Sequence, residues 1–318
     1  MVAFLIRRTF GMIIVLLAVS FVTYLIFFKI PGGDVAGRIA GKQATPQNIA
    51  DIRQKLGLDK SVFVQWWDMM KQLLEGNLIS YYDGTNVVQQ IKEGIPETFS
   101  LCIGAGIIWL GFGVLVGTIS AVTAGGASDR AITALALIGI SLPVAWLGLL
   151  LRYFFAGEGG AVAWFPDGGY VPLTTNPWQW FYHLLLPWFT LAILFIGFYG
   201  RVLRSNILDT INEDFVRTAK AKGLSSRRIL VKHTLRASLI PIVTLFGLDF
   251  AAVLGGGAII TETVYSIHGV GYYAAASIHQ QDLPPLMGVT LYGATFIVVF
   301  STLVDVAYAY LDPRIRLT

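Results

Sequence analysis

Six apolar stretches of membrane length constrain this chain more than any other feature. Each runs for about 20 residues or more with few charges, which is enough for a helix to cross about 30 Å of hydrocarbon. Only 13% of the 318 residues are charged, about half the share that is usual in soluble domains. The stretches cover residues 9–29, 97–122, 131–156, 183–203, 239–264 and 287–311. We therefore predict a single all-α integral membrane domain over residues 1–318, with six transmembrane helices.

The charges between these stretches predict how the chain is oriented. The loop over residues 204–238 carries eight Lys and Arg residues, whereas residues 157–182 and 265–286 carry none. Because positively charged loops tend to stay in the cytoplasm, the 204–238 loop and both termini are expected to be cytoplasmic. Arg7 and Arg8 near one end of the chain agree with this orientation.

The long segment over residues 34–96 then lies outside the cell, between the first two spans. Its helical spacing and its glycine stops predict two or three short helices that cap the external face. Two tryptophans and two methionines in it are expected to contact the headgroup layer: Trp66, Trp67, Met69 and Met70.

Residues that carry recognisable chemistry are scarce. Cys102 is the single cysteine, the four histidines are far apart in sequence, and no metalloprotease or hydrolase motif occurs. The basic residues flank membrane spans, where orientation explains them better than nucleic-acid binding does. We expect no catalytic residue, metal or cofactor in this chain, and no nucleic-acid partner.

Two acidic residues lie in the fifth apolar stretch. Asp249 is deep within it and Glu262 is towards its end. An unpaired charge deep in a bilayer costs at least about 2.5 kcal/mol, so Asp249 should face a partner or a wet cavity. A structural hydrogen bond and a place on a substrate path both remain open, and Asp249 and Glu262 are the path candidates. Gly255–Gly257 predict close helix packing, either within the bundle or against another membrane subunit.

The loop 204–238 has an ordered pattern of its own. A short amphipathic helix ends at Gly223, the residue type that favours the left-handed turn after a helix, and a second basic helix follows. Small residues on the first helix suit insertion into a groove on a partner. The candidate contact residues are Asp214, Phe215, Val216, Arg217, Thr218, Ala219, Ala221, Lys222, Gly223, Leu224 and Arg227.

The run RTAKAKGLSSRRILVKHTLRASLIP resembles the cytoplasmic loop of ATP-binding-cassette importer permeases. Ala219 and Gly223 match that family's Glu-Ala-Ala–x3–Gly pattern, whereas Arg217 and Thr218 replace its Glu-Ala. Those departures resemble the dipeptide/oligopeptide/nickel subfamily. Segments along the whole chain agree, among them LGLDKSVFVQW, GAIITETVYSIHGVGYY and VDVAYAYLDPRIR.

The resemblance implies a fold, a function and a set of partners. The fold would be the type I importer kind, and the chain would be the first of two permease subunits in a bacterial or archaeal inner membrane. Its partners would be a second homologous permease, two cytosolic ATPase subunits (or one fused ATPase), and an external solute-binding protein. ATP and Mg would bind only to the ATPases, while the permease moves peptides, or alternatively nickel, heme or another small solute, by alternating access.

Two other classes of membrane protein fit the sequence less well. A membrane-bound enzyme would show clusters of polar residues at span ends, and a secondary transporter would show symmetric broken helices in its two halves. The sequence shows neither pattern.

Overall fold

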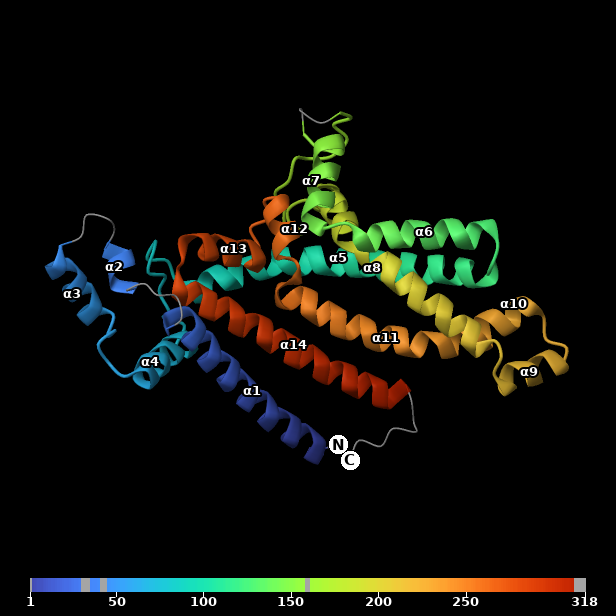
Figure 1. Ribbon diagram of the computed structural model, residues 1–318, viewed down its shortest axis with the longest axis horizontal. Helices are drawn as coiled ribbons and strands as arrows, with labels where there is room; N and C mark the ends of the chain where they lie inside the picture. Colours follow the sequence, from blue (N-terminus) through green and yellow to red (C-terminus); the bar gives the residue numbers. More distant parts are fainter. Residues whose placement is uncertain (1, 30–34, 41–44, 158–160, 312–318) are drawn as a thin grey trace.

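The computed structural model describes residues 2–29, 35–40, 45–157 and 161–311, and its regular elements are helices (Figure 1). In these ranges the strand-like contacts are two isolated bridges, Ile79–Asn86 and Ala156–Phe165. The four longest helices are α1 (Val2–Lys29), α5 (Val87–Val122), α8 (Pro177–Thr210) and α14 (Leu283–Leu311).

A fifth long helical run joins four consecutive pieces. They are α10 (Ser226–Arg228), the π-helical stretch η1 (Ile229–Thr234), α11 (Leu235–Ala252) and a second π-helical stretch η2 (Val253–Gly257). This run and the four longest helices are each long and apolar enough to cross a membrane. The pair α6 (Ala127–Ser141) and α7 (Val144–Phe155) makes a sixth if it is taken as one bent span. The prediction of an all-α membrane protein is therefore confirmed.

The sequence had suggested one continuous third span over residues 131–156. The structure instead bends by 103° between α6 and α7. Leu142 precedes Pro143, and the proline ring disfavours helical geometry in the residue before it. Leu142 accordingly has an extended ψ of 128°, and Pro143 begins α7 as its N-cap. Figure 1 shows α7 standing away from the direction of α6.

The core of the molecule lies where α5 packs along α8. Trp109 of α5 is fully buried there and stacks on Phe195 of α8, with 4.4 Å between ring centroids. Trp109 also makes an edge-to-face contact with Phe246 of α11, with 5.5 Å between ring centroids. One aromatic cluster thus joins α5, α8 and α11.

Several helices extend beyond the predicted spans. Asn86 accepts a hydrogen bond from the Gln89 amide and starts α5 at Val87, so that Pro96 lies inside the helix rather than before it. α8 continues to Thr210, and the fifth helical run begins at Ser226. The segment that connects these two long helices is therefore residues 211–225, shorter than the predicted loop over residues 204–238.

The fifth span ends earlier than predicted, because Gly256 has a φ of 147° and breaks the helix. Gly255 beside it packs within the bundle, where a Cβ would lie 3.0 Å from the Gly293 carbonyl oxygen of α14. Two more helices follow the break, α12 (Ile259–Val264) and α13 (Val270–Gln280). The predicted loop over residues 265–286 therefore contains α13, which the sequence pattern had not revealed.

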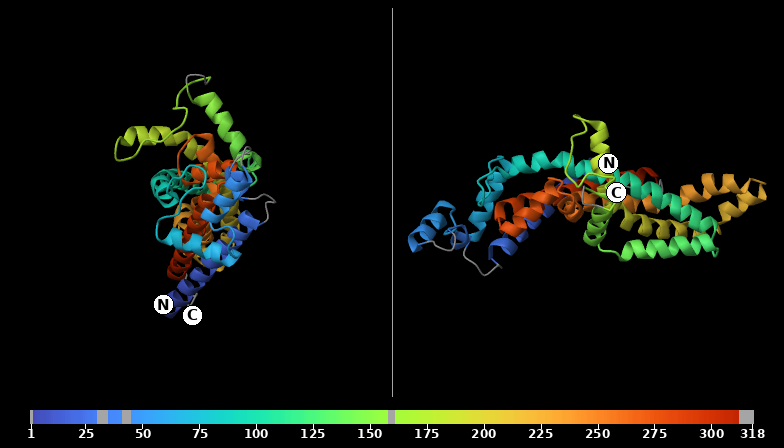
Figure 2. Two further views of the ribbon diagram at one scale, coloured as in Figure 1. Left: turned by 90° about the vertical axis from the view of Figure 1, so that its left-hand side faces the viewer. Right: turned by 90° about the horizontal axis from the view of Figure 1, so that it is seen from above.

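The predicted outer segment contains α2 (Val35–Ala40), α3 (Pro46–Lys55) and α4 (Val62–Leu74). These helices lie at the opposite end of the elongated molecule from α9 (Asp214–Ala221) and α10 (Figures 1 and 2). A buried cluster that includes Tyr24 and Met287 also contains Trp66, Met69 and Met70. The prediction that these three residues contact the headgroup layer is therefore wrong. Trp67 remains 54% exposed.

Candidate functional site: the loop over residues 204–238 and its connection to the membrane helices

The predicted contact loop folds into two short helical pieces with a small core of their own. α9 (Asp214–Ala221) packs on η1, and the buried residues between them are Val216, Ala219 and Ile229, with Leu224 against them. Ala219 is 5% exposed. The side chains of Val216 and Ala219 therefore pack between α9 and η1. The sequence pattern had led us to expect that they face a partner.

Gly223 closes α9 by a turn that fixes the direction of the chain. Its φ of 73° is left-handed, its amide donates to the Lys220 carbonyl at 2.9 Å, and the Leu224 amide donates to the Ala219 carbonyl at 3.3 Å. This pair of hydrogen bonds with a hydrophobic residue after the glycine is a Schellman motif. A Cβ on Gly223 would meet nothing within 4 Å, so the constraint at this position is purely conformational.

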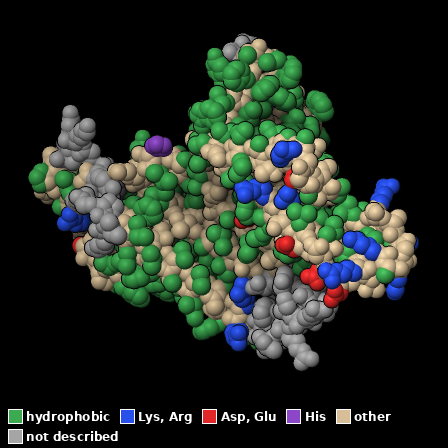
Figure 3. All heavy atoms as spheres, turned by 45° about the vertical axis from the view of Figure 1, so that its right-hand side comes forward, with side chains coloured by type: hydrophobic (Ala, Val, Ile, Leu, Met, Phe, Trp, Pro, Cys, Tyr) green, Lys and Arg blue, Asp and Glu red, His purple; other side chains and the backbone are tan. Residues whose placement is uncertain are grey.

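The outer face of this element is cationic with one exposed aromatic ring. Phe215 is 46% exposed. The other exposed residues of the predicted contact set are Asp214, Arg217, Thr218, Ala221, Lys222 and Arg227. Lys and Arg side chains gather at this end of the molecule (Figure 3). An exposed aromatic ring together with exposed Lys and Arg residues on one element is suited to a protein groove that has an acidic rim.

The element is attached to the ends of two membrane helices. The Ser238 hydroxyl of α11 lies within hydrogen-bond distance of the Asn206 carbonyl oxygen (3.2 Å) and of Thr210 Oγ1 (3.0 Å) of α8. The side-chain amide of Asn206 donates to the Ser238 carbonyl oxygen (3.4 Å). α8 enters the loop and the α10–η1–α11 run leaves it, both as long helices. Residues 211–213 separate α8 from α9, and residues 222–225 separate α9 from α10, so both connections to the membrane spans are short.

A buried ion pair near the same end was not predicted. Arg204 of α8 donates to both carboxylate oxygens of Asp129 at 2.7 Å, and Ser120 of α5 donates to the same carboxylate. Asp129 is 4% exposed. The pair joins α5, α6 and α8. An acidic residue just after the Gly125–Gly126 turn was the available sequence signal, but nothing local indicated Arg204 as its partner.

The two path candidates lie in different surroundings. Asp249 of α11 is half-buried and accepts a hydrogen bond of 2.7 Å from the buried Tyr199 hydroxyl of α8. Glu262 of α12 is fully buried. Its Oε1 accepts from Thr98 Oγ1 at 2.7 Å, and its Oε2 accepts from the Tyr272 amide at 2.8 Å.

Glu262 thereby caps the start of α13. Thr98 Oγ1 accepts the Val270 amide at 2.9 Å while donating to Glu262, so two side chains together satisfy two amides in the first turn of that helix. The carboxylate connects α5, α12 and α13. The structure thus gives both path candidates a structural partner.

A second cluster lies at the start of the predicted outer loop after α7. Arg152 donates to both oxygens of Asp167 at 2.9 and 2.7 Å and to the Val264 carbonyl at 2.6 Å. We call Arg152, Asp167 and Val264 the outer latch. The Arg152 guanidinium holds the pKa of the Asp167 carboxyl below its usual value. These hydrogen bonds connect the loop after α7 to the end of α12.

The described residues contain no group of three or more side chains suited to a metal ion. The conspicuous polar features of the described chain are instead helix caps, ion pairs between helices and the cationic loop.

Comparisons with known proteins cover nearly the whole chain. Residues 113–317 match the family described as "binding-protein-dependent transport system inner membrane component", and residues 1–102 match the N-terminal family of the same membrane components. A "probable peptide ABC transporter permease protein" of Sinorhizobium fredii is 36% identical over 98% of this chain and 99% of its own.

Two further relatives have similar coverage. The dipeptide transport system permease protein DppB of Alkalihalophilus pseudofirmus is 34% identical over 99% of this chain and 100% of its own. The glutathione transport system permease protein GsiC of Salmonella choleraesuis is 35% identical over 99% of each chain.

A solved structure, an inward-facing form of the MetNI methionine ABC transporter, shares the fold. Its TM-score is 0.51 with 16% identity, over 72% of this chain and 97% of the other. The predicted fold of the type I importer kind is in agreement with this likeness. The sequence matches establish that this chain belongs to the family of inner-membrane components of binding-protein-dependent transport systems, and is a multi-pass membrane permease.

Proposed function

We propose that this chain forms half of the membrane pathway of an ATP-driven importer for peptides. Its relatives are named for peptides, dipeptides and glutathione, which favours peptides over the nickel and heme alternatives. The observation that carries the proposal is the α9–η1 element, a closed cationic helical pair attached rigidly to two membrane spans.

The element would act as the coupling contact with a cytosolic ATPase. Phe215 would insert into an apolar groove on the ATPase, while the surrounding Lys and Arg residues meet its acidic rim. When the ATPases close on ATP, α9 would move with them and would turn α8 and α11 together. ATP and Mg would stay on the partner subunits, and a second permease would complete the pathway.

The orientation follows from the same assignment. The 204–238 loop and both termini would lie in the cytoplasm, and residues 34–96 with the outer latch would face an external solute-binding protein. Permeases of this kind work by differential stability of two conformations, so this chain would supply no bond-making chemistry.

The test uses the importer purified with the subunits that it assembles with, in proteoliposomes. We expect ATP-dependent uptake of labelled dipeptides or oligopeptides that requires the binding protein. Uptake of nickel or heme without any peptide uptake would reject the proposed substrate.

A variant pair tests the coupling contact separately. Phe215→Ala should abolish stimulation of ATP hydrolysis by the liganded binding protein, because it removes the exposed apolar anchor. Val231→Ala is the matched control, since Val231 is also an exposed apolar residue (57% exposed) but belongs to η1 rather than to α9. Equal coupling in both variants would contradict docking through Phe215.

A further inference from the structure

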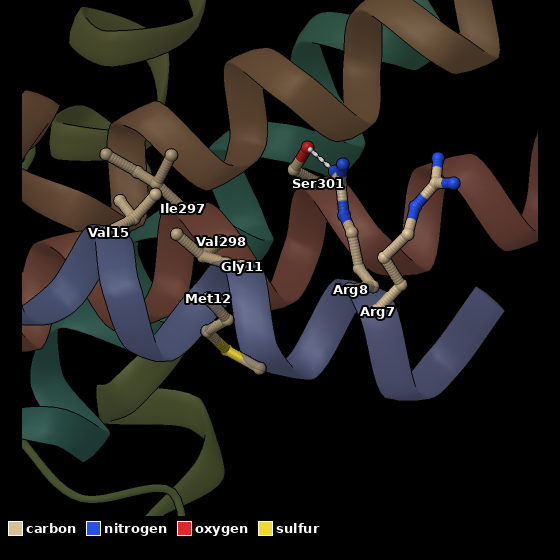
Figure 4. A pocket seen from close by; sticks show the side chains of 8 residues that line it. All are labelled: Arg7, Arg8, Gly11, Met12, Val15, Ile297, Val298 and Ser301. Carbon is tan, nitrogen blue, oxygen red and sulfur yellow. Dashed lines mark hydrogen bonds between the residues drawn. The ribbon is translucent and has the colours of Figure 1, made fainter. Parts of the chain in front are cut away.

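A groove between α1 and α14 combines an apolar floor with two arginines at one end. Its volume is about 390 Å³, and it is lined by Arg7, Arg8, Gly11, Met12, Val15, Ile297, Val298 and Ser301. Figure 4 shows the two arginines together at one end, extending to the same side, with Val15 and Ile297 at the other end. We call it the α1–α14 groove.

The arginine end is partly preorganised. Arg8 donates to Ser301 Oγ at 3.0 Å and to Thr302 Oγ1 at 3.3 Å, which holds its guanidinium against α14. Arg7 is exposed, and no acidic side chain of the described residues forms an ion pair with it. Guanidinium groups bind phosphate through planar, paired hydrogen bonds, so this end suits a phosphate oxygen better than a neutral group.

The apolar end is open because of a glycine. A Cβ on Gly11 would meet nothing within 4 Å, so the glycine leaves space along the helix rather than allowing a neighbour to approach. Met12, Val15 and Ile297 form the walls around that space. From Arg7 to Val15 the groove follows α1 for about 12 Å, the length of several methylene groups of an acyl chain.

The surroundings of the groove are those of a surface in contact with lipid. In α1 17% of the apolar window is buried, against 28–44% in the other four long spans. Phe10 and Ile14 beside the groove are 65% and 51% exposed. The proposed orientation puts this end of α1 at the cytoplasmic leaflet, where anionic lipid headgroups are attracted to basic residues near helix ends.

We propose that the α1–α14 groove binds an anionic phospholipid, with its phosphate at Arg7 and Arg8 and one acyl chain over Gly11. The lipid would hold α1 against α14, with which it is in contact. The leaflet assignment rests on the proposed orientation, whereas the pairing of a basic end with an apolar channel does not.

The test uses the assembled importer in nanodiscs and native mass spectrometry. Phosphatidylglycerol should be retained in preference to phosphatidylethanolamine with the same chains. Arg7→Gln should weaken phosphatidylglycerol retention about fivefold, the worth of one interfacial arginine. Gly11→Leu should remove it by filling the channel, and it should not disturb the fold because the site is open.

Matched controls are available in the chain. Gly111 on α5 is an exposed helical glycine that also has open space, and Arg130 on α6 is an exposed arginine that does not line the groove. Gly111→Leu and Arg130→Gln should leave lipid retention unchanged.

Three outcomes would overturn the proposal. Retention that is unaffected by Gly11→Leu, together with binding of inorganic phosphate at the arginines, would mean that the site takes a free anion. Loss of another subunit in Gly11→Leu, with lipid retained, would mean that the groove is a protein interface. Equal retention of both lipids by all variants would mean that no lipid site exists there.

Discussion

Gly223 requires a left-handed backbone conformation, and a β-branched residue there is strained by about 1–2 kcal/mol. We expect Gly223→Val to uncouple ATP hydrolysis from transport while the permease still inserts, and Gly223→Asn to retain coupling because Asn tolerates this conformation. The measurement is stimulation of ATP hydrolysis by the liganded binding protein.

Gly76 provides a matched control for that strain. It closes α4 with a φ of 75° and the same pair of hydrogen bonds, and a Cβ there also meets nothing within 4 Å. Gly76→Val should lower thermal stability by a similar amount but leave the coupling intact. If Gly76→Val uncoupled the complex as strongly, the effect of Gly223→Val would be one of general stability.

Ala219 tests whether the loop has a core of its own. Ala219→Glu would place a charge between Val216 and Ile229, so we expect α9 to separate from η1 and proteolysis of the loop to accelerate about tenfold. Ala221→Glu on the exposed face of the same helix should leave proteolysis unchanged. Similar cleavage of both variants would show that α9 does not pack on η1.

Asp249 tests the alternative between a structural bond and a substrate path. Asp249→Asn keeps an acceptor for the Tyr199 hydroxyl, so we expect stability and transport to be retained. Asp249→Ala leaves that hydroxyl without a partner and should cost about 1 kcal/mol, measured by thermal unfolding of the purified complex. Loss of transport in a stable Asp249→Asn variant would instead assign the charge to the path.

At the scale of elements, the outer latch makes a prediction about pH. The pKa of Asp167 is depressed in the folded protein, so the contribution of the latch is present above the pKa of a free aspartate. The contribution decreases as the pH falls below about 4, where a free aspartate titrates, and is lost as the pH falls through the lower pKa that Asp167 has in the folded protein. Asp167 is 62% exposed, so solvent screening keeps the effect small.

The measurement is hydrogen exchange of residues 161–176 at neutral and acidic pH. Acidification should lower the protection factors there, which are corrected for the intrinsic pH dependence of exchange, in the native chain but not in Asp167→Asn, in which the latch is already weakened. Equal acid sensitivity in both chains would assign the change to another group.

At the scale of the whole molecule, the charge asymmetry predicts which ends face the cytoplasm. Single cysteines at Ser128 and Ser226 should be protected from an impermeant maleimide in intact cells, whereas Asp83 and His268 should label. All four positions are exposed, and the native Cys102 is fully buried and is replaced by Ala. Labelling at position 226 from outside would reverse the proposed topology.

Much of this molecule follows from local sequence. The apolar stretches predict the spans because hydrophobic length is a property of consecutive residues. Gly223 likewise predicts the end of α9, since backbone strain acts at one residue. The bend at Leu142–Pro143 had a local signal as well, but its size of 103° depends on how α7 packs beyond it.

Only the tertiary structure decided which partner each side chain has. Glu262 caps α13 with the help of Thr98, which lies 164 residues away, and Ala219 faces Ile229 rather than a partner. The α1–α14 groove joins segments almost 300 residues apart, with Arg8 bonded to Ser301 across a separation of 293. Periodicity predicts that a helix has a buried face, but which neighbour covers that face depends on packing between distant segments, which no local pattern encodes.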